Sequence, residues 1–286
     1  MARFNNMKIR ILILFLLTAF TLKAQQQESL SISAGPAREA AFKGGEQFTF
    51  SVSYSLAKVL SGDVGEVTFK TTNTLLNNIP TYRITANAKT LPNYRLFYVL
   101  DDTYDTWLDI ETLRPLKFSS RLREDKYRYR ADLTYDWDSM VVHTVKRNLK
   151  WPEDKSKTIQ LTPGSFDALA VFYNLRSQDA SSFRPGENRR MELLLDDTIR
   201  VVNYKFIGRE NKTIKKMGTF RTLKFSCQLA TSEGQSFDDG SEFFLWISDD
   251  KNKIPLYIES PIKVGSIKGS LVKYQGLKYP LDSKIK

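Results

Sequence analysis

Hydrophobic and polar residues alternate with a period of two through much of the chain. From Phe48 to Tyr54, aromatic and aliphatic side chains occupy every second position, with Thr or Ser between them. Tyr82 to Ala88 and Tyr127 to Tyr135 repeat this alternation, and the second of these runs has Arg, Asp and Thr on its polar face. Successive side chains of a strand point to opposite faces of a sheet. Each segment is therefore predicted to be a strand with one buried face.

Turn signals separate these strands from further apolar runs. Asp136 to Ser139 predicts a hairpin turn, and Gly62 to Gly65 predicts another turn. The further predicted strands are Met140–Val145, Ile199–Phe206, Phe220–Leu229, Phe243–Ile247 and Ser266–Tyr274. Many strands joined by short turns indicate an antiparallel, mainly β body.

One segment breaks the period of two. After Thr162-Pro163-Gly164, a start signal with proline able to occupy the first helical position, residues 165–176 predict a helix. Its apolar side chains form two stripes, one of Phe166, Leu169, Ala170 and Tyr173, the other of Ala168, Val171, Phe172 and Leu175. A flat sheet would cover one stripe, whereas a curved sheet wrapped around the helix would cover both. We therefore predict a curved antiparallel sheet, a half-barrel or open barrel, with one buried helix near residues 165–176. A helix between a sheet and a long loop is the alternative.

The N-terminus has the pattern of a cleavable export signal. Basic residues in Met7 to Arg10 precede the apolar run Ile11 to Leu17, and a site for cleavage follows Ala24. The run is shorter than the roughly 20 apolar residues of a membrane span. We expect a signal peptide over 1–24, a flexible lead-in over 25–41 and a single β-rich domain over 42–286. The protein is then periplasmic, or secreted as the alternative, with no transmembrane anchor in the mature chain.

Charge and cysteine content narrow the classes of partner. The formal net charge is +11, and removal of the predicted leader, which carries four basic and no acidic residues, leaves +7. Because charges of both signs are interspersed, we expect no nucleic-acid partner. An anionic lipid or a glycan is the candidate ligand. The lone cysteine, Cys227, allows neither an intrachain disulfide nor a lipid anchor at the cleavage point, and we expect it to be buried.

Catalytic and metal chemistry has few candidates. His143 is the only histidine, which excludes a site of two or three histidines, and its place beside Val141 and Val145 favours an ordinary strand residue. Adjacent aspartates leave a glycan hydrolase open as an alternative, although such pairs are typical of turns. These pairs are Asp101-Asp102, Asp196-Asp197, Asp238-Asp239 and Asp249-Asp250. We predict no catalytic residue, no metal site and no cofactor.

Aromatic residues are the remaining candidates for a binding site, because they would line the concave face of a curved sheet. The predicted wall consists of Phe48, Phe50, Tyr54, Tyr82, Tyr127, Tyr129 and Tyr135. Tyrosine tolerates a polar or wet cavity better than phenylalanine does, since its hydroxyl needs a partner when buried. Packing of the same side chains into a solid core is the alternative interpretation.

Two distant segments share a pattern of tryptophan, polar turn, proline and strand: residues 107–116 and 246–256. These segments, together with Phe42 to Glu46, Asp101 to Asp105, the predicted helix and Met217 to Phe220, resemble the bacterial domain-of-unknown-function family 3108 over about residues 42–277. The hairpins and the helix are also similar to those of periplasmic carriers of outer-membrane lipoproteins, whose half-barrels hold acyl chains. The first resemblance implies no activity, and the second implies a fold more than a function.

Three functions follow from these expectations. The first is a non-enzymatic envelope protein that binds or carries a lipid or glycan in the concavity of the sheet. The second is a structural or adaptor protein with an envelope protein partner, which would show an exposed apolar patch. The third is a glycan hydrolase that uses a pair of aspartates.

Overall fold

The computed structural model describes residues 39–285 except 57–59, 196, 230–241 and 262–265. The strands are β1 (Gln47–Leu56), β2 (Leu60–Leu76), β3 (Ile79–Thr90), β4 (Asp101–Asp109), β5 (Pro115–Glu124), β6 (Tyr127–Asp136), β7 (Val141–Asn148), β8 (Lys155–Gln160), β9 (Ser165–Phe166), β10 (Asn188–Leu195), β11 (Thr198–Ile214), β12 (Gly218–Leu229), β13 (Glu242–Ser248), β14 (Pro255–Pro261) and β15 (Ser266–Gln275). The helices are α2 (Ala168–Arg176) and two short 3-10 turns, η1 (Pro92–Tyr94) and η2 (Ala180–Ser182).

All of these strands belong to one sheet. Its order is β8-β7-β6-β5-β4-β3-β2-β1-β15-β14-β13-β12-β11-β10-β9, so each half of the chain folds as a meander of sequential neighbours. The first and last strands join the halves, since β1 pairs antiparallel with β15 from Gln47–Gln275 to Ser55–Ser266. All pairings are antiparallel except that of β9 with β10. Over the described residues the predicted fold class is confirmed, a mainly β protein whose single open sheet curves around one α-helix.

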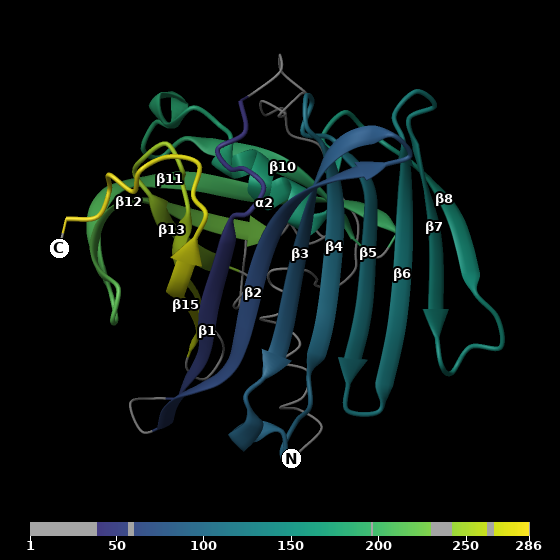
Figure 1. The fold of residues 1–286 in the computed structure, drawn as a ribbon, viewed down its shortest axis with the longest axis horizontal. Coiled ribbons are helices and arrows are strands. Elements are labelled where there is room, and N and C mark those ends of the chain that lie inside the picture. The colour runs from purple at the N-terminus through teal and green to yellow at the C-terminus, as the bar shows by residue number, and fades with distance from the viewer. Residues whose placement is uncertain (1–38, 57–59, 196, 230–241, 262–265, 286) are drawn as a thin grey trace.

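The sheet curves around α2. In Figure 1, β1–β6 run up and down the view, β10 and β11 cross behind them, and α2 lies between the two walls. The helix contacts β4 on one wall and β9 and β10 on the other. Both predicted stripes are accordingly in contact with the core: Tyr173 packs among residues of β1–β4, and Leu175 among residues of β10–β13. Within the described residues, no helix is long and apolar enough to cross a bilayer.

The helix starts later than its sequence pattern predicts. Ser165 and Phe166 form β9 beside Glu192 and Leu193, and the helix begins at Ala168. Asp167 decides this boundary, because its carboxylate accepts a hydrogen bond from the backbone N–H of Ala170, 3.0 Å away. A side-chain cap of this kind satisfies one of the free N–H groups of the first turn.

The glycines from Gly62 to Gly65 do not form the predicted turn; they lie inside β2. A register shift in the β1–β2 pairing lies between Val52 and Ser53, next to these glycines. A Cβ atom on Gly65 would lie 3.1 Å from the carbonyl oxygen of Lys89, and one on Gly62 would lie 2.8 Å from the Tyr94 hydroxyl. The two glycines permit close approach along the strand.

Packing begins slightly before the predicted domain start at Phe42. Residues 1–38, with the predicted signal peptide and most of the lead-in, lie outside the described residues, but Ala40 and Ala41 are already buried. The Ala40 carbonyl accepts a hydrogen bond from the Lys278 ammonium at 2.8 Å, which ties this segment to the C-terminal end.

The two segments that share the tryptophan–turn–proline pattern form equivalent hairpins, β4–β5 and β13–β14. Asp109 and Asp250 close their turns by accepting backbone N–H groups two and three residues ahead. Trp107 and Trp246 both face away from the helix, since the residues directly before and after each of them are buried on the opposite face of the sheet. Basic side chains cover both rings, Arg83 over Trp107 and Lys212 over Trp246, at 5.1 and 4.0 Å from the ring centres.

Candidate functional site

A cavity of about 520 Å³ lies between β4–β8 and the ends of β10 and α2. The helix fills the concavity under β1–β4 but does not extend beneath β5–β8 (Figure 1). A small buried cluster that includes Tyr135 and Val142 fills part of the space beneath these strands, and the cavity occupies another part. The cavity volume is in the range usual for sites that bind small molecules, about 300–1,000 Å³.

The lining combines apolar and aromatic side chains with a few polar groups. It comprises Tyr104, Phe118, Ser120, Leu122, Glu124, Tyr127, Tyr129, Ala131, Leu133, Lys146, Trp151, Lys155, Asp167, Ala168, Leu194, Leu195 and Asp197. The rings of Tyr127 and Tyr129 stack, with centroids 6.1 Å apart, and Trp151 packs edge-on against Tyr129 at 6.2 Å. The Lys155 ammonium lies 4.5 Å above the Trp151 ring. Aromatic groups thus form a connected surface at one end of the cavity.

The structure places two of the seven predicted wall residues, Tyr127 and Tyr129, in this cavity. Phe48 and Phe50 are buried in the cluster around α2, and Tyr54 and Tyr82 pack against that cluster. Tyr135 is buried in a separate small cluster of β6 and β7. All three tyrosines of β6 point to the concave side, as the alternation predicts, because a sheet face contains every second residue.

The lower end of the cavity contains buried carboxyl groups. Glu124, only 2 % exposed, accepts a hydrogen bond from the Tyr98 hydroxyl at 2.9 Å. Asp102 lies nearby on β4 and accepts from the Arg123 backbone N–H and the Tyr104 hydroxyl. Burial, reinforced by the charge of Glu124, raises the pKa of Asp102 to about 7. Asp102 therefore keeps its proton to a higher pH than an ordinary aspartate does.

Polar contacts of the start of α2 and of the β10–β11 turn border the cavity at its upper end and its far side. Asp167 accepts hydrogen bonds from the Thr106 hydroxyl and the Ala170 backbone, and burial raises its pKa to about 6. The turn between β10 and β11 is held against β7 by an ion pair of 2.7 Å between Lys146 and Asp197. This ion pair fixes the far side of the cavity relative to β7.

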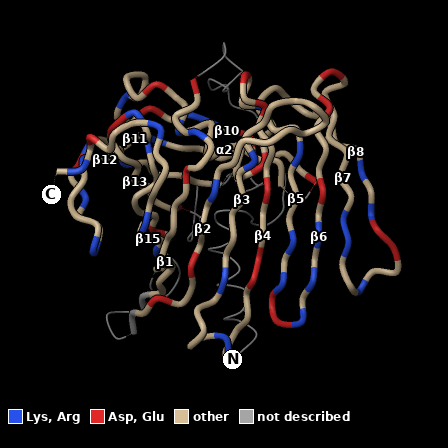
Figure 2. Tube along the Cα trace, viewed as in Figure 1, with Lys and Arg blue, Asp and Glu red and all other residues tan. Residues whose placement is uncertain are grey.

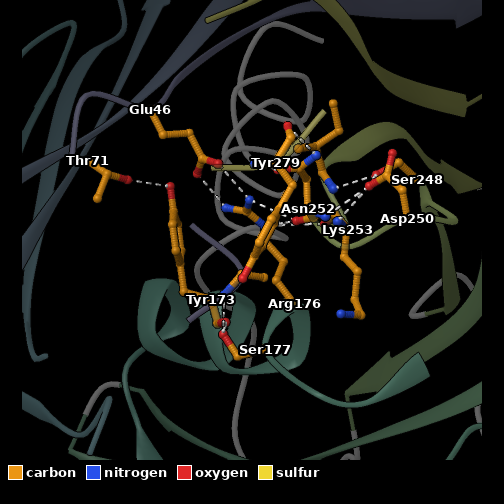
Figure 3. Close-up of polar contacts among 12 residues, drawn as sticks. Glu46, Thr71, Tyr173, Arg176, Ser177, Ser248, Asp250, Asn252, Lys253 and Tyr279 are labelled. Atoms are coloured by element: carbon orange, nitrogen blue, oxygen red, sulfur yellow. Dashed lines mark hydrogen bonds and ion pairs between the residues drawn. The ribbon is translucent and has the colours of Figure 1, made fainter. Parts of the chain in front are cut away.

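A second polar cluster lies in the core rather than in a cavity (Figure 3). The Arg176 guanidinium, at the last turn of α2, binds both carboxylate oxygens of Glu46 at 2.7 and 2.9 Å. It also donates to the carbonyl oxygens of Asn252 and Lys253, and both charged side chains are 0 % exposed. Burial opposes the charged form, but the Glu46 carboxylate outweighs it and raises the pKa of Arg176. This cluster joins α2, the segment before β1 and the β13–β14 turn, so we assign it a structural role.

His143 is an exposed strand residue, and Cys227 is a buried core residue. His143 is exposed and its Nδ1 lies 3.0 Å from the Thr158 hydroxyl oxygen on the neighbouring strand. Cys227 is buried in the cluster of β10–β13, and burial raises the pKa of its thiol to about 12. The two residues lie on opposite faces of the sheet and do not form a nucleophile–base pair.

The fold gives the described aspartates of these pairs different surroundings. Asp101 is exposed and Asp102 buried, because neighbouring residues of β4 point to opposite faces. Asp249 pairs with Arg209, and Asp250 caps its turn. Asp197 alone of the paired residues lines the cavity; Asp196, Asp238 and Asp239 lie outside the described residues.

Most residues that line the cavity are not among the predicted site residues. Lys146, Trp151 and Lys155 belong to β7, a loop and β8, and Leu194 comes from β10, which no strand prediction covered. The segment of β5 from Lys117 to Glu124 alternates only in part, because Phe118 and Leu122 share their face with polar residues, so its sequence gives a weak signal for this wall. Contact between β10 and β7 carries no local signal, because the two strands are far apart in both the sequence and the sheet order.

The comparisons with known proteins agree with this architecture. A crystal structure of a beta-barrel-like protein of domain of unknown function DUF1849 from Brucella abortus aligns with a TM-score of 0.54 and 13 % identity, covering 84 % of this chain and 98 % of that chain. At this identity the likeness shows the fold alone. No curated protein matches the chain. Residues 49–272 match the family described as protein of unknown function (DUF3108), which is most of the chain. The chain therefore belongs to the DUF3108 family.

Proposed function

We propose that this protein is an exported envelope protein that binds an amphipathic molecule, a lipid or a glycan, in the cavity between β4–β8 and β10. The observation that carries the proposal is the cavity itself, which lies on the concave face where the helix leaves the sheet uncovered. A sheet whose only task was to enclose a core would be filled to the density usual of protein interiors.

The distribution of lining groups suits a ligand with one apolar and one polar part. Leu133, Leu194 and Leu195 form an aliphatic surface at the upper end, near the start of α2. Tyr127 and Lys155 belong to the lower end, where aromatic rings offer flat faces and the ammonium offers a positive charge. Ligand sites commonly combine such an apolar lining with a few polar groups that fix orientation.

Native mass spectrometry of the protein purified gently from its own periplasmic fraction tests this proposal. Extra mass that disappears on organic extraction is the expected result, and its fragmentation identifies the lipid or glycan. A mass beginning at residue 25 supports export and cleavage after Ala24. A protein that remains bare in every gentle preparation would overturn the binding proposal and favour the adaptor alternative.

A matched pair of variants connects the ligand to this cavity. Ala131→Phe fills the cavity from β6, whereas Thr134→Phe adds the same side chain to the exposed face of the same strand. We expect Ala131→Phe to lose most of the bound mass and Thr134→Phe to retain it. Ser120→Leu, a smaller filling substitution on β5, serves if Ala131→Phe does not fold. Retention of ligand by a folded cavity-filling variant would place the ligand elsewhere.

A further inference from the structure

Two large apolar side chains project from the lower end of the sheet. Leu96 and Phe97, in the connection between β3 and β4, are 93 % and 80 % exposed. Figure 1 shows this connection, with η1, extending below the ends of the neighbouring strands. Nothing in the described part of the chain covers either side chain. Leu149, in the loop between β7 and β8 at the same end, is 72 % exposed.

The connection holds these side chains outward in a defined conformation. The backbone N–H groups of Phe97 and Tyr98 donate to the carbonyl oxygen of Tyr94, and Tyr98 is buried with its hydroxyl on Glu124. The next residue, Val99, exchanges hydrogen bonds with the backbone and carboxylate of Asp125 in the β5–β6 turn. Because Tyr98 points inward and is anchored, its predecessors Leu96 and Phe97 are displayed to solvent.

The same rim is the end of the cavity lined by aromatic groups. Glu124 ends β5 and Tyr127 begins β6, so the lining reaches the turn that holds the projecting connection. Tyr98 links the two directly, since it follows Phe97 in the chain and binds Glu124 of the cavity wall. A surface that receives Leu96 and Phe97 therefore lies next to the cavity.

Basic side chains surround the projecting pair. Lys and Arg follow the lower parts of β5 and β6 in Figure 2. Arg95, Arg123, Lys126 and Lys150 are exposed on or near this rim, together with the acidic residues Asp101, Asp125, Glu153 and Asp154. Asp154 forms an ion pair with Arg147, at 2.9 Å. Of these acids, Asp125 accepts a hydrogen bond from the Val99 backbone N–H. The rim is thus suited to a surface of negative charge.

We propose that this rim docks on an anionic lipid surface, with Leu96 and Phe97 inserted among the headgroups and the mouth of the cavity at the bilayer. The proposal deepens the proposed function, since it provides the route by which a lipid would enter or leave the cavity. Exposed apolar side chains beside Lys and Arg are typical of interfacial anchors. A specific protein interface buries about 800 Å² on each partner, far more than a pair of projecting side chains provides.

Flotation of the purified protein with vesicles tests the docking. Vesicles of phosphatidylcholine alone are compared with vesicles of equal parts phosphatidylcholine and phosphatidylglycerol. Leu96→Ser/Phe97→Ser is compared with Leu75→Ser/Ile79→Ser, which removes two exposed apolar side chains from the β2–β3 hairpin at the opposite end of the sheet. We expect the first variant to lower the vesicle-bound fraction at phosphatidylglycerol by roughly tenfold, and the second to leave it unchanged. Salt should weaken binding of the wild type.

Three results would overturn the docking proposal. The wild type could fail to bind either vesicle, or the two variants could lose vesicle binding equally. In the third result, Leu96→Ser/Phe97→Ser keeps vesicle binding but no longer binds a purified envelope protein that the wild type binds. The mass-spectrometric assay separates this failure from failure of the proposed function. Leu96→Ser/Phe97→Ser should retain its ligand while losing vesicle binding. Ala131→Phe should lose its ligand while retaining vesicle binding.

Discussion

Replacing Arg176 with methionine removes one member of a fully buried ion pair. The guanidinium makes two hydrogen bonds to Glu46 and further bonds to the carbonyl oxygens of Asn252 and Lys253. It also lies 5.0 Å from the centre of the Phe48 ring. Arg176→Met therefore leaves a carboxylate and two carbonyl groups in the core without their donor. Glu46→Met leaves the guanidinium without its counter-charge.

The size of the effect follows from burial. Both side chains are 0 % exposed, and breaking such a pair from one side costs about 3–5 kcal/mol. For a domain of this length, this loss lowers the melting temperature by about 6–20 °C. Replacing both partners removes the uncompensated charge, so the double variant should lose at least ~2 kcal/mol less than the sum of the two single losses. Arg147→Met, which breaks a largely exposed pair with Asp154, should cost no more than about 1 kcal/mol.

Urea unfolding, followed by tryptophan fluorescence and far-ultraviolet circular dichroism, gives the free energy of unfolding of each protein. The proteins compared are the wild type, Arg176→Met, Glu46→Met, the double variant and the control Arg147→Met. Equal slopes of the transitions establish that the variants unfold from comparably compact states. Strict additivity of the two single losses, or a loss for Arg176→Met as small as that for Arg147→Met, would refute the assignment of this pair as a brace between α2 and the sheet.

Three further measurements address single side chains. Because burial raises the pKa of Asp102 from its usual 3.8 to about 7, the folded state retains a proton that the unfolded state loses, so the free energy of unfolding should fall by up to about 4 kcal/mol between pH 4 and pH 7. Asp102→Asn should flatten urea-unfolding profiles across that window; an unchanged profile contradicts the assignment. Asp167→Ala removes the cap of α2 and should cost about 1–2 kcal/mol, whereas Asp136→Ala, in an exposed turn, provides the comparison. Cys227 should react with a thiol reagent at pH 8 only in denaturant, since it is buried with its pKa near 12, and prompt labelling of the native protein would contradict its position.

Local patterns predicted the strands well where one face is buried and the other wet. The alternation in Tyr127 to Tyr135 corresponds to β6, and the aspartate at 136 closes the following turn by accepting the Ser139 backbone N–H. β8 was missed because its residues, Lys155–Gln160, are nearly all exposed and show no alternation of burial. The glycines of β2 predict a turn that the structure does not contain, because a glycine that permits close approach has the same local pattern as one that permits a reversal.

The candidate site was less predictable than the fold. Tyr127 and Phe48 have the same alternation in the sequence, yet one lines the cavity and the other packs around α2. Their difference depends on where the helix ends relative to each strand. The repeated tryptophans at 107 and 246 lie on the outer face under basic side chains, and no periodicity distinguishes that covered outer face from the core.

The sequence by itself determined the period of each strand, the presence of one helix with two apolar stripes, and the capping aspartates of the turns, because these depend on residues a few positions apart. The tertiary structure alone decided that β1 pairs with β15, that Glu46 meets Arg176 across 130 residues, and that the β10–β11 turn borders a cavity beside β7. Contacts between such distant segments depend on the curvature of the whole sheet around α2. Local propensity does not encode that curvature, which arises from many pairings formed together.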